Sequence, residues 1–165
     1  MDLEARLHDA APSEHPEALR LWLRLLTCTQ LVEKQVRTRL RDQFGTTLPR
    51  FDLMAQLERA PEGLKMKDLS RRMMVTSGNV TGITDQLVAE GLVERVDVAG
   101  DRRVFLVRLT PHGREQFDAM AHAHAQWIVD AFGPLGERDI ATLHRLLGKV
   151  KAHAQPAQPL QETTA

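Results

Sequence analysis

The chain has 165 residues, of which 42% are hydrophobic and only 4% aromatic, a composition that favours helices over sheets in one domain or two closely joined ones. Its formal net charge is +0 at pH 7, which does not by itself indicate a nucleic-acid partner, although the basic residues cluster between residues 20 and 46. The single cysteine, Cys28, excludes an internal disulfide and a cysteine-cluster zinc site, and the lack of a signal peptide or of an apolar run of about 20 residues predicts a soluble cytoplasmic protein.

The outer parts of the chain are predicted to form long helices. Residues 17–44 contain no Gly or Pro and carry apolar residues every three to five positions, which indicates a helix ended by Gly45. Pro111 suits the first turn of a helix that extends to Phe132, and a last helix covers 137–153. Such helices cannot bury their apolar stripes within one chain. We therefore expect a helical dimerisation region formed by 17–46 and 111–153, with flexible tails at 1–16 and 154–165.

The central part, 47–110, has the order of a winged helix-turn-helix domain. A helix that begins near Pro49 is followed by a short helix over 66–74, a turn at Val75–Thr76 and a second helix over 77–90. Thr76 or Ser77 can cap that second helix, and Gly91 ends it. Two strands, 92–96 and 104–109, then form a hairpin through 98–102. The fold class that we predict is mainly α with a small β-wing.

The second of these helices has the surface of a DNA-recognition helix. At roughly 100° per residue, Val80, Ile83, Leu87 and Val88 fall on the core side. The opposite side carries small polar residues: Ser77, Gly78, Asn79, Thr81, Gly82, Asp85 and Gln86. Side chains of this size let a helix approach base edges in the major groove. An ordinary surface helix, which is the alternative interpretation, would normally carry Lys, Glu and Arg here.

Individual side chains on this face match known base contacts. Asn79 can read an adenine, Gln86 can do the same or bind a phosphate, and Thr81 can contact a thymine methyl group. Gly82 costs about 1 kcal/mol relative to Ala in a helix interior, which makes sense if the backbone approaches DNA there.

Four arginines are predicted to contact the DNA backbone or the minor groove. Arg102 and Arg103 lie at the hairpin tip, where one of them can enter a narrow minor groove while Asp101 holds the other. A solvated tip with a surface ion pair is the alternative. Arg71 and Arg72 lie on the supporting helix, where phosphate contacts are usual.

Taken together, these motifs resemble the MarR family of transcriptional regulators. The resemblance covers about residues 20–152 and rests on Leu48–Leu57, Leu69–Arg72, Gly78–Leu87, Glu90–Arg95, Gly100–Arg103 and Leu109–Gly113. It implies an obligate homodimer, held by helices 17–44, 112–132 and 137–153, that binds a pseudo-palindromic double-stranded DNA operator. Repression is the usual direction of regulation in the family. Gly100 departs from the polar or basic residue usual at that wing position, so the choice between Arg102 and Arg103 stays open.

The resemblance also implies a small-molecule effector. It would bind in a crevice between the dimer helices and the winged domain, and its binding would release the protein from DNA. Trp22, Cys28, Phe51, Met54 and Trp127 could form its apolar walls, although simple core packing is the more common role of such residues. Arg24, Arg37, Arg50 and His124 could pair with an anion, or could simply lie on a solvated face. Residues 47–52 and 78–87 are similar to regulators of aromatic-acid degradation, which points to a small aromatic acid or its acyl-CoA thioester. No cofactor and no metal are expected.

Three alternatives stay open. Cys28 could act as a thiol switch, with Arg24 one turn away, although a lone cysteine is more often a buried apolar residue. An enzyme is disfavoured because His122 and His124, two residues apart, point away from each other on a helix, and no phosphate loop, HExxH motif or Ser-centred elbow occurs. The third is a protein-interaction module that has lost DNA binding. The presence of potential DNA contacts argues against it: Asn79, Thr81, Arg102 and Arg103.

Overall fold

The structure is a computed structural model and describes residues 16–98 and 101–154. It divides into two compact units that meet between Trp127 and Ile128, and each is described by itself. Its elements, in chain order, are α2 (Pro16–Phe44), α3 (Leu48–Glu58), β1 (Leu64–Lys65), α4 (Met66–Met73), α5 (Ser77–Ala89), β2 (Val93–Val98), β3 (Asp101–Leu109), α6 (Pro111–Phe132) and α7 (Glu137–Ala154). The predicted fold class, mainly α with a small β-wing, is confirmed.

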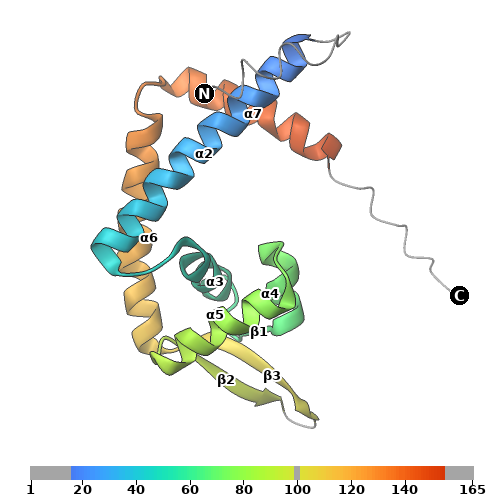
Figure 1. Cartoon of the computed structure of the whole chain (residues 1–165), viewed down its shortest axis with the longest axis vertical. Helices are drawn as coiled ribbons and strands as arrows, with labels where there is room; N and C mark the ends of the chain where they lie inside the picture. Colours follow the sequence, from blue (N-terminus) through green and yellow to red (C-terminus); the bar gives the residue numbers. More distant parts are fainter. Residues whose placement is uncertain (1–15, 99–100, 155–165) are drawn as a thin grey trace, which may run out of the picture. The chain divides into compact units, whose positions relative to one another are not determined.

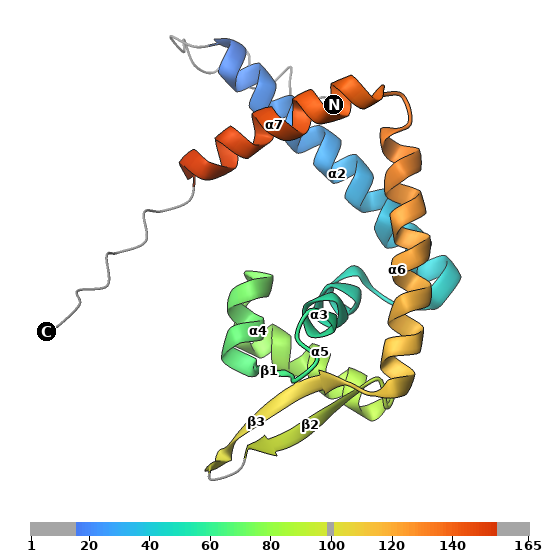
Figure 2. The same cartoon turned by 180° about the vertical axis from the view of Figure 1, so that it is seen from behind.

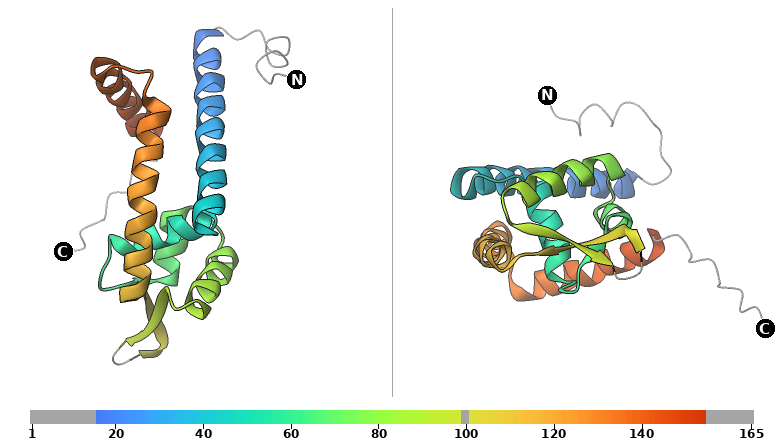
Figure 3. Two further views of the ribbon diagram at one scale, coloured as in Figure 1. Left: turned by 90° about the vertical axis from the view of Figure 1, so that its left-hand side faces the viewer. Right: turned by 90° about the horizontal axis from the view of Figure 1, so that it is seen from below.

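Helix α2 is one uninterrupted helix of 29 residues, as its lack of Gly and Pro predicts (Figure 3). It ends where Gly45 adopts a positive φ of 62° and its N–H donates to the Arg41 carbonyl over 3.0 Å. Leu23, Val36 and Leu40 are its buried residues. Pro16, assigned to the flexible N-terminal tail from the sequence, is instead the first residue of this helix, and Ala154 is the last residue of α7.

The winged-helix core lies between α3, α4, α5 and the sheet, which are gathered together in Figure 1. Leu53, Leu57, Leu69, Leu87 and Val107 are each fully buried there, so every layer contributes to one apolar interior. Burial of whole leucine side chains stabilises a fold by about 1.5–3 kcal/mol each. This interior therefore fixes the positions of α4 and α5 relative to the hairpin.

The sheet is antiparallel, with strand order β1-β3-β2. The strand pattern predicted β2 and β3 but missed β1, whose two residues, Leu64 and Lys65, are too short to show alternation. The strands also extend further toward the tip than predicted, so that only 99–100 separate them, with a register shift between Asp97 and Val98. Figure 2 shows this hairpin projecting away from the helices of the core.

A tight junction joins the sheet to α6. The Thr110 hydroxyl donates to the Gly91 carbonyl over 2.7 Å and accepts from the Gly113 N–H over 2.9 Å, so it caps the helix. Gly113 is buried against the backbone of Leu92, the residue before β2, and a Cβ built on it would lie 1.8 Å from the Leu92 carbonyl oxygen. Only glycine allows α6 to start this close to the sheet.

The two ends of the chain contribute helices with unburied apolar residues. Helix α7 has no buried residue, and Ile140, Leu147 and Val150 on it are exposed. On α2, Trp22 and Leu31 are 58% and 56% exposed. Among the helices described, none combines the length and the apolar character that crossing a membrane requires.

Candidate nucleic-acid interface and ligand cleft

The start of α5 is fixed by local hydrogen bonds. The Thr76 side chain accepts from the Asn79 N–H over 3.4 Å, which confirms the predicted N-cap. In the preceding turn, Met74 adopts a positive φ of 55°, and the Ser70 hydroxyl donates to the Val75 carbonyl over 2.7 Å. One hydrogen bond thus ties the turn to α4 and another ties it to α5. Together they fix the orientation of the first residues of α5.

The surface of α5 divides as the helical periodicity predicts. The predicted DNA-facing residues are all exposed: Ser77, Gly78, Asn79, Thr81, Gly82, Asp85 and Gln86. Val80 and Leu87 are fully buried, while Ile83 and Val88 are half-buried. Thr84 is also fully buried, which the pattern of apolar residues did not predict. Its hydroxyl donates to the Val80 carbonyl over 2.8 Å, so it needs no partner outside the helix.

The side chains of this face differ in whether their polar groups already bond to other residues of the protein. The Thr81 hydroxyl donates to the Ser77 carbonyl over 2.9 Å, which leaves its methyl group for an apolar contact. Asp85 forms an ion pair with Arg95 of β2, so it is not an isolated negative charge. The side chains of Asn79 and Gln86 make no hydrogen bond to any described residue and remain available to a partner.

The predicted phosphate-binding arginines are not equivalent. Arg71 pairs with Asp68 over 2.8 Å, whereas exposed Arg72 has no ion pair within the described part of the chain. Arg102 and Arg103 fall on β3, but their side chains lie outside the described part of the chain. The same holds for Asp101, and Gly100 is not described at all.

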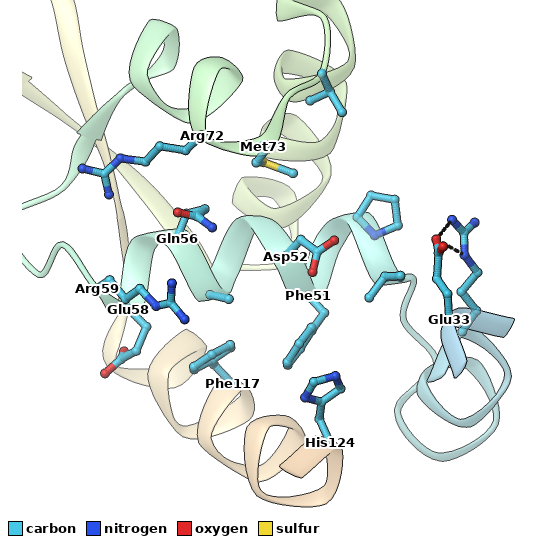
Figure 4. Close-up of a pocket in the computed structure, with 15 residues that line it drawn as sticks. Glu33, Phe51, Asp52, Gln56, Glu58, Arg59, Arg72, Met73, Phe117 and His124 are labelled. Carbon is cyan, nitrogen blue, oxygen red and sulfur yellow. Dashed lines mark hydrogen bonds and ion pairs between the residues drawn. The ribbon is translucent and has the colours of Figure 1, made fainter. Parts of the chain in front are cut away.

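A cleft of about 770 Å³ lies along α3 (Figure 4). Phe51, Phe117 and His124 form an aromatic wall, with ring centroids 5.5 Å apart for the two phenylalanines and 5.0 Å apart for Phe51 and His124. At one end, Arg37 of α2 donates from Nε to Glu33 over 3.0 Å. Figure 4 shows Arg59 and Arg72 extending toward the opposite end. Neither makes an ion pair with a described residue, whereas Glu58, which lies beside Arg59, pairs with Arg114 over 2.7 Å.

Asp52 is the titratable group of the cleft with a shifted pKa. Burial raises the pKa of this carboxyl above its usual value, and the charge of His124 partly offsets that rise. Glu33 raises the pKa further, while Arg37 lowers it. Charged groups on α2 and α6 therefore influence the pKa of this one carboxyl on α3.

The cleft gathers only part of the predicted ligand set: Arg37, Phe51 and His124. A separate cavity of about 320 Å³ is lined by Arg50 and Met54, where Arg50 pairs with Glu90 and its Nε atom is buried without a partner. Other members of the set line neither cavity: Trp22, Arg24, Cys28 and Trp127. Trp127 is buried and packs on the rings of Phe44 and His124, and Cys28 is exposed rather than buried.

Several cleft residues escaped the sequence interpretation. Gln56 lies on α3, Arg59 is the C-cap residue that follows this helix, and Phe117 lies on α6, about two turns before His124. The spacing of Phe117 and His124, seven residues, places both on one helix face and could have indicated the wall. Arg59 gave no such signal, because it follows the last turn of α3 in a charged surface segment.

Comparisons with known proteins identify the family. Residues 44–104 match the model described as the MarR family. The transcriptional activatory protein BadR of Rhodopseudomonas palustris is 30% identical over 143 residues, which cover 84% of this chain and 81% of BadR. A MarR family transcriptional regulator from Silicibacter pomeroyi superposes with a TM-score of 0.73 and 30% identity, over 88% of this chain and 100% of that chain. The chain belongs to the MarR family.

Other MarR structures share the fold at lower identity. Sco3205 from Streptomyces coelicolor, solved in complex with DNA, superposes with a TM-score of 0.77 at 22% identity, over 90% of this chain and 94% of that one. The family consists of winged-helix transcriptional regulators and not of enzymes. Within residues 16–98 and 101–154, no group of three or more His, Cys, Asp or Glu side chains is arranged to hold a metal ion.

Proposed function

We propose that this MarR protein is a homodimeric repressor that binds a pseudo-palindromic operator and is released by a small aromatic acid or its CoA thioester. The exposed, small-residue face of α5 is the observation that carries the proposal. Side chains of this size keep the helix backbone within reach of base edges. Asn79 and Gln86, whose amides bond no other residue in the part of the chain that the structure describes, would read adenine. A regulator of this kind acts in the cytoplasm.

DNA contacts would come from three elements of the winged domain. Helix α5 would enter the major groove through the exposed face defined above. Arg72, exposed and unpaired among the described residues, would bind a phosphate, while Arg71 would first have to leave Asp68. Arg102 or Arg103 on the hairpin would enter the minor groove. Solved relatives include an Escherichia coli MarR mutant complexed with operator DNA, which shares this fold at 24% identity.

Dimerisation is supported by the apolar residues that one chain leaves exposed. Helix α7 buries none of its residues, although it carries Ile140, Leu146, Leu147 and Val150. Exposed apolar side chains at helical spacing indicate a surface that another chain covers. A two-fold symmetric protein would place its two α5 helices in half-sites about one helical turn, ~34 Å, apart.

The effector proposal rests on the chemistry of the cleft along α3. Its volume of about 770 Å³ lies within the range of small-molecule sites, roughly 300–1,000 Å³. The rings of Phe51, Phe117 and His124 suit an aromatic group, and Arg59 and Arg72 suit a carboxylate or phosphate. A hundredfold loss of DNA affinity requires the effector to prefer the DNA-incompetent state by about 2.7 kcal/mol.

The test begins with DNA binding. The protein is titrated into duplexes from the region upstream of its own gene at several salt concentrations. Because phosphate contacts release counterions, we expect the logarithm of affinity to fall linearly and steeply with the logarithm of salt. A flat dependence, or equal affinity for every duplex, would contradict a sequence-specific regulator and would favour an interaction module.

The effector and the direction of regulation need separate assays. Thermal-shift measurements with 4-hydroxycinnamic acid and its CoA thioester are expected to raise the melting temperature for at least one of them. A reporter under the bound promoter is expected to rise when the gene for this protein is deleted. A fall would contradict repression and would match the activatory role in the name of BadR.

A thiol-based redox repressor is the second candidate, because Cys28 is exposed on α2. Peroxide would then release DNA from the parent protein but not from Cys28→Ser. Equal behaviour of both proteins excludes the thiol mechanism.

A further inference from the structure

Arg95 joins the recognition helix to the wing through two different contacts. Its guanidinium forms an ion pair with Asp85 on the exposed face of α5. The same guanidinium lies over the Phe105 ring of β3, 5.2 Å from its centroid. Arg95 and Phe105 are diagonal neighbours across the β2–β3 ladder, since Arg95 is paired with Val107. One side chain therefore spans α5, β2 and β3.

The position of Asp85 makes this contact relevant to DNA binding. Asp85 is 56% exposed on the face that would meet DNA, and an isolated carboxylate there would be repelled by phosphates. A unit charge about 10 Å from a phosphate, at an effective dielectric constant of about 20, changes affinity by roughly 3- to 15-fold, depending on screening by salt. The pairing with Arg95 cancels this charge within the protein.

We propose that Arg95 is a positioning residue for operator recognition: it neutralises Asp85 and fixes α5 to the wing, and it does not itself bind a phosphate. The inference rests on the proposed DNA binding. It reassigns Asp85 from a DNA contact to one half of an internal ion pair. It also explains how a recognition face of small polar residues tolerates an acid.

The proposal predicts an unusual pattern of binding by single and double variants. Arg95→Ala exposes the Asp85 charge and loosens the wing, so we expect operator affinity to fall about 10- to 30-fold. Asp85→Ala also breaks the tie between α5 and the wing, but it removes the repulsive charge at the same time, so its affinity should fall less than that of Arg95→Ala. The double variant should bind better than Arg95→Ala alone. A direct phosphate contact predicts instead that the double variant binds no better than Arg95→Ala.

The salt dependence of binding separates the two roles independently. Loss of one phosphate contact lowers the slope of log affinity against log salt by about 1. If Arg95 only positions α5, the slope of the double variant equals that of the parent. Arg108→Ala is the matched control, because Arg108 forms a 2.6 Å ion pair with Glu94 on the same two strands, on the face of the ladder opposite to Arg95. It should leave affinity and slope unchanged.

The experiment uses the full-length protein and a duplex that the parent enriches from a random pool, measured by fluorescence anisotropy. Arg95→Gln, which keeps most of the side-chain stem, replaces Arg95→Ala if the latter fails to fold in thermal denaturation. Recovery of affinity in the double variant with an unchanged slope supports the proposal. Parent-like affinity of the Arg95 variant, additive losses or a lowered slope overturn it. Failure of the parent to enrich any duplex contradicts the proposed DNA binding itself.

Discussion

Replacement of Gly82 by alanine separates the stability of the recognition helix from its access to DNA. Gly82 lies in the middle of α5 on its exposed face, and a Cβ built on it meets no atom within 4 Å. The methyl group therefore costs nothing in packing. Alanine is favoured over glycine in a helix interior by about 0.8–1 kcal/mol, so Gly82→Ala should stabilise the protein by about that amount.

The same methyl group should weaken operator binding. If the α5 backbone approaches the bases at Gly82, the added carbon pushes the helix out of the groove and lengthens its base contacts. Loss of one good base contact costs about 1–3 kcal/mol, which corresponds to roughly 5- to 150-fold in affinity. The variant would thus become more stable and bind more weakly, a combination that partial unfolding cannot produce.

Thermal denaturation and fluorescence anisotropy with the selected duplex measure the two effects on the same samples. Gly148→Ala in α7 is the control for the stability gain, because its Cβ also meets no atom within 4 Å of the single chain. It should gain stability by a similar amount; because α7 carries the proposed dimer surface, this control calibrates stability alone. A Gly82→Ala protein that is stabilised and binds like the parent would refute the close approach of α5 to DNA.

Three further changes test the fold, the cleft and the dimer. Gly113→Ala places a methyl group against the Leu92 carbonyl, which displaces α6 and breaks its Thr110 cap. The free energy of unfolding, measured by chemical denaturation, should fall by about 2–3 kcal/mol. An unchanged denaturation midpoint would contradict the packing of α6. Burial raises the pKa of Asp52, so the folded state binds its proton more tightly than the unfolded state, and the charged carboxylate weakens the fold above that raised pKa. Asp52→Asn should therefore stabilise the protein at pH 7 and lose this advantage below about pH 4, where both states are protonated. Aspartate at both Leu143 and Leu147 should give monomers by size-exclusion chromatography that no longer bind the operator, and full-affinity binding by a monomer would contradict the dimer.

The fold was largely predictable from the sequence because local signals agreed with tertiary packing. The turn at Val75–Thr76, the cap at Thr76 and the apolar strand pattern in 104–109 each predicted the element that the structure contains. Thr84 shows where such reasoning stops. A polar residue is assigned to the surface by pattern, yet its hydroxyl bonds the preceding turn and lets it be buried. Strand β1 exists only because β3 lies beside it, so no local pattern could reveal it.

The ligand cleft was less predictable because its residues are gathered by three-dimensional packing. Phe51 and His124 come from helices far apart in sequence, and Trp127, equally aromatic and close by, packs inward instead. Arg50 was expected in the same site but pairs with Glu90 at a separate cavity. Residue type alone does not decide between these outcomes, since each depends on which side of a helix meets which neighbour.

Arg72 connects the cleft with the DNA-facing surface, and this connection can be tested. It lines the cleft on α4 and is also the predicted phosphate contact without an ion pair among the described residues. An anion held by Arg72 would therefore compete with a DNA phosphate for the same guanidinium. Arg59 lies at the same end of the cleft but directly after the last residue of α3, not on α4 or α5.

The two arginines should consequently differ. Arg72→Ala should weaken operator binding severalfold, because one charge-assisted phosphate contact is lost, and should also weaken the response to 4-hydroxycinnamoyl-CoA. Arg59→Ala should weaken only the response to the thioester. Anisotropy titrations with and without the thioester give both quantities for each variant. Parent-like DNA binding by Arg72→Ala, or an equal loss of DNA binding in Arg59→Ala, would contradict the sharing of Arg72 between the cleft and the DNA surface.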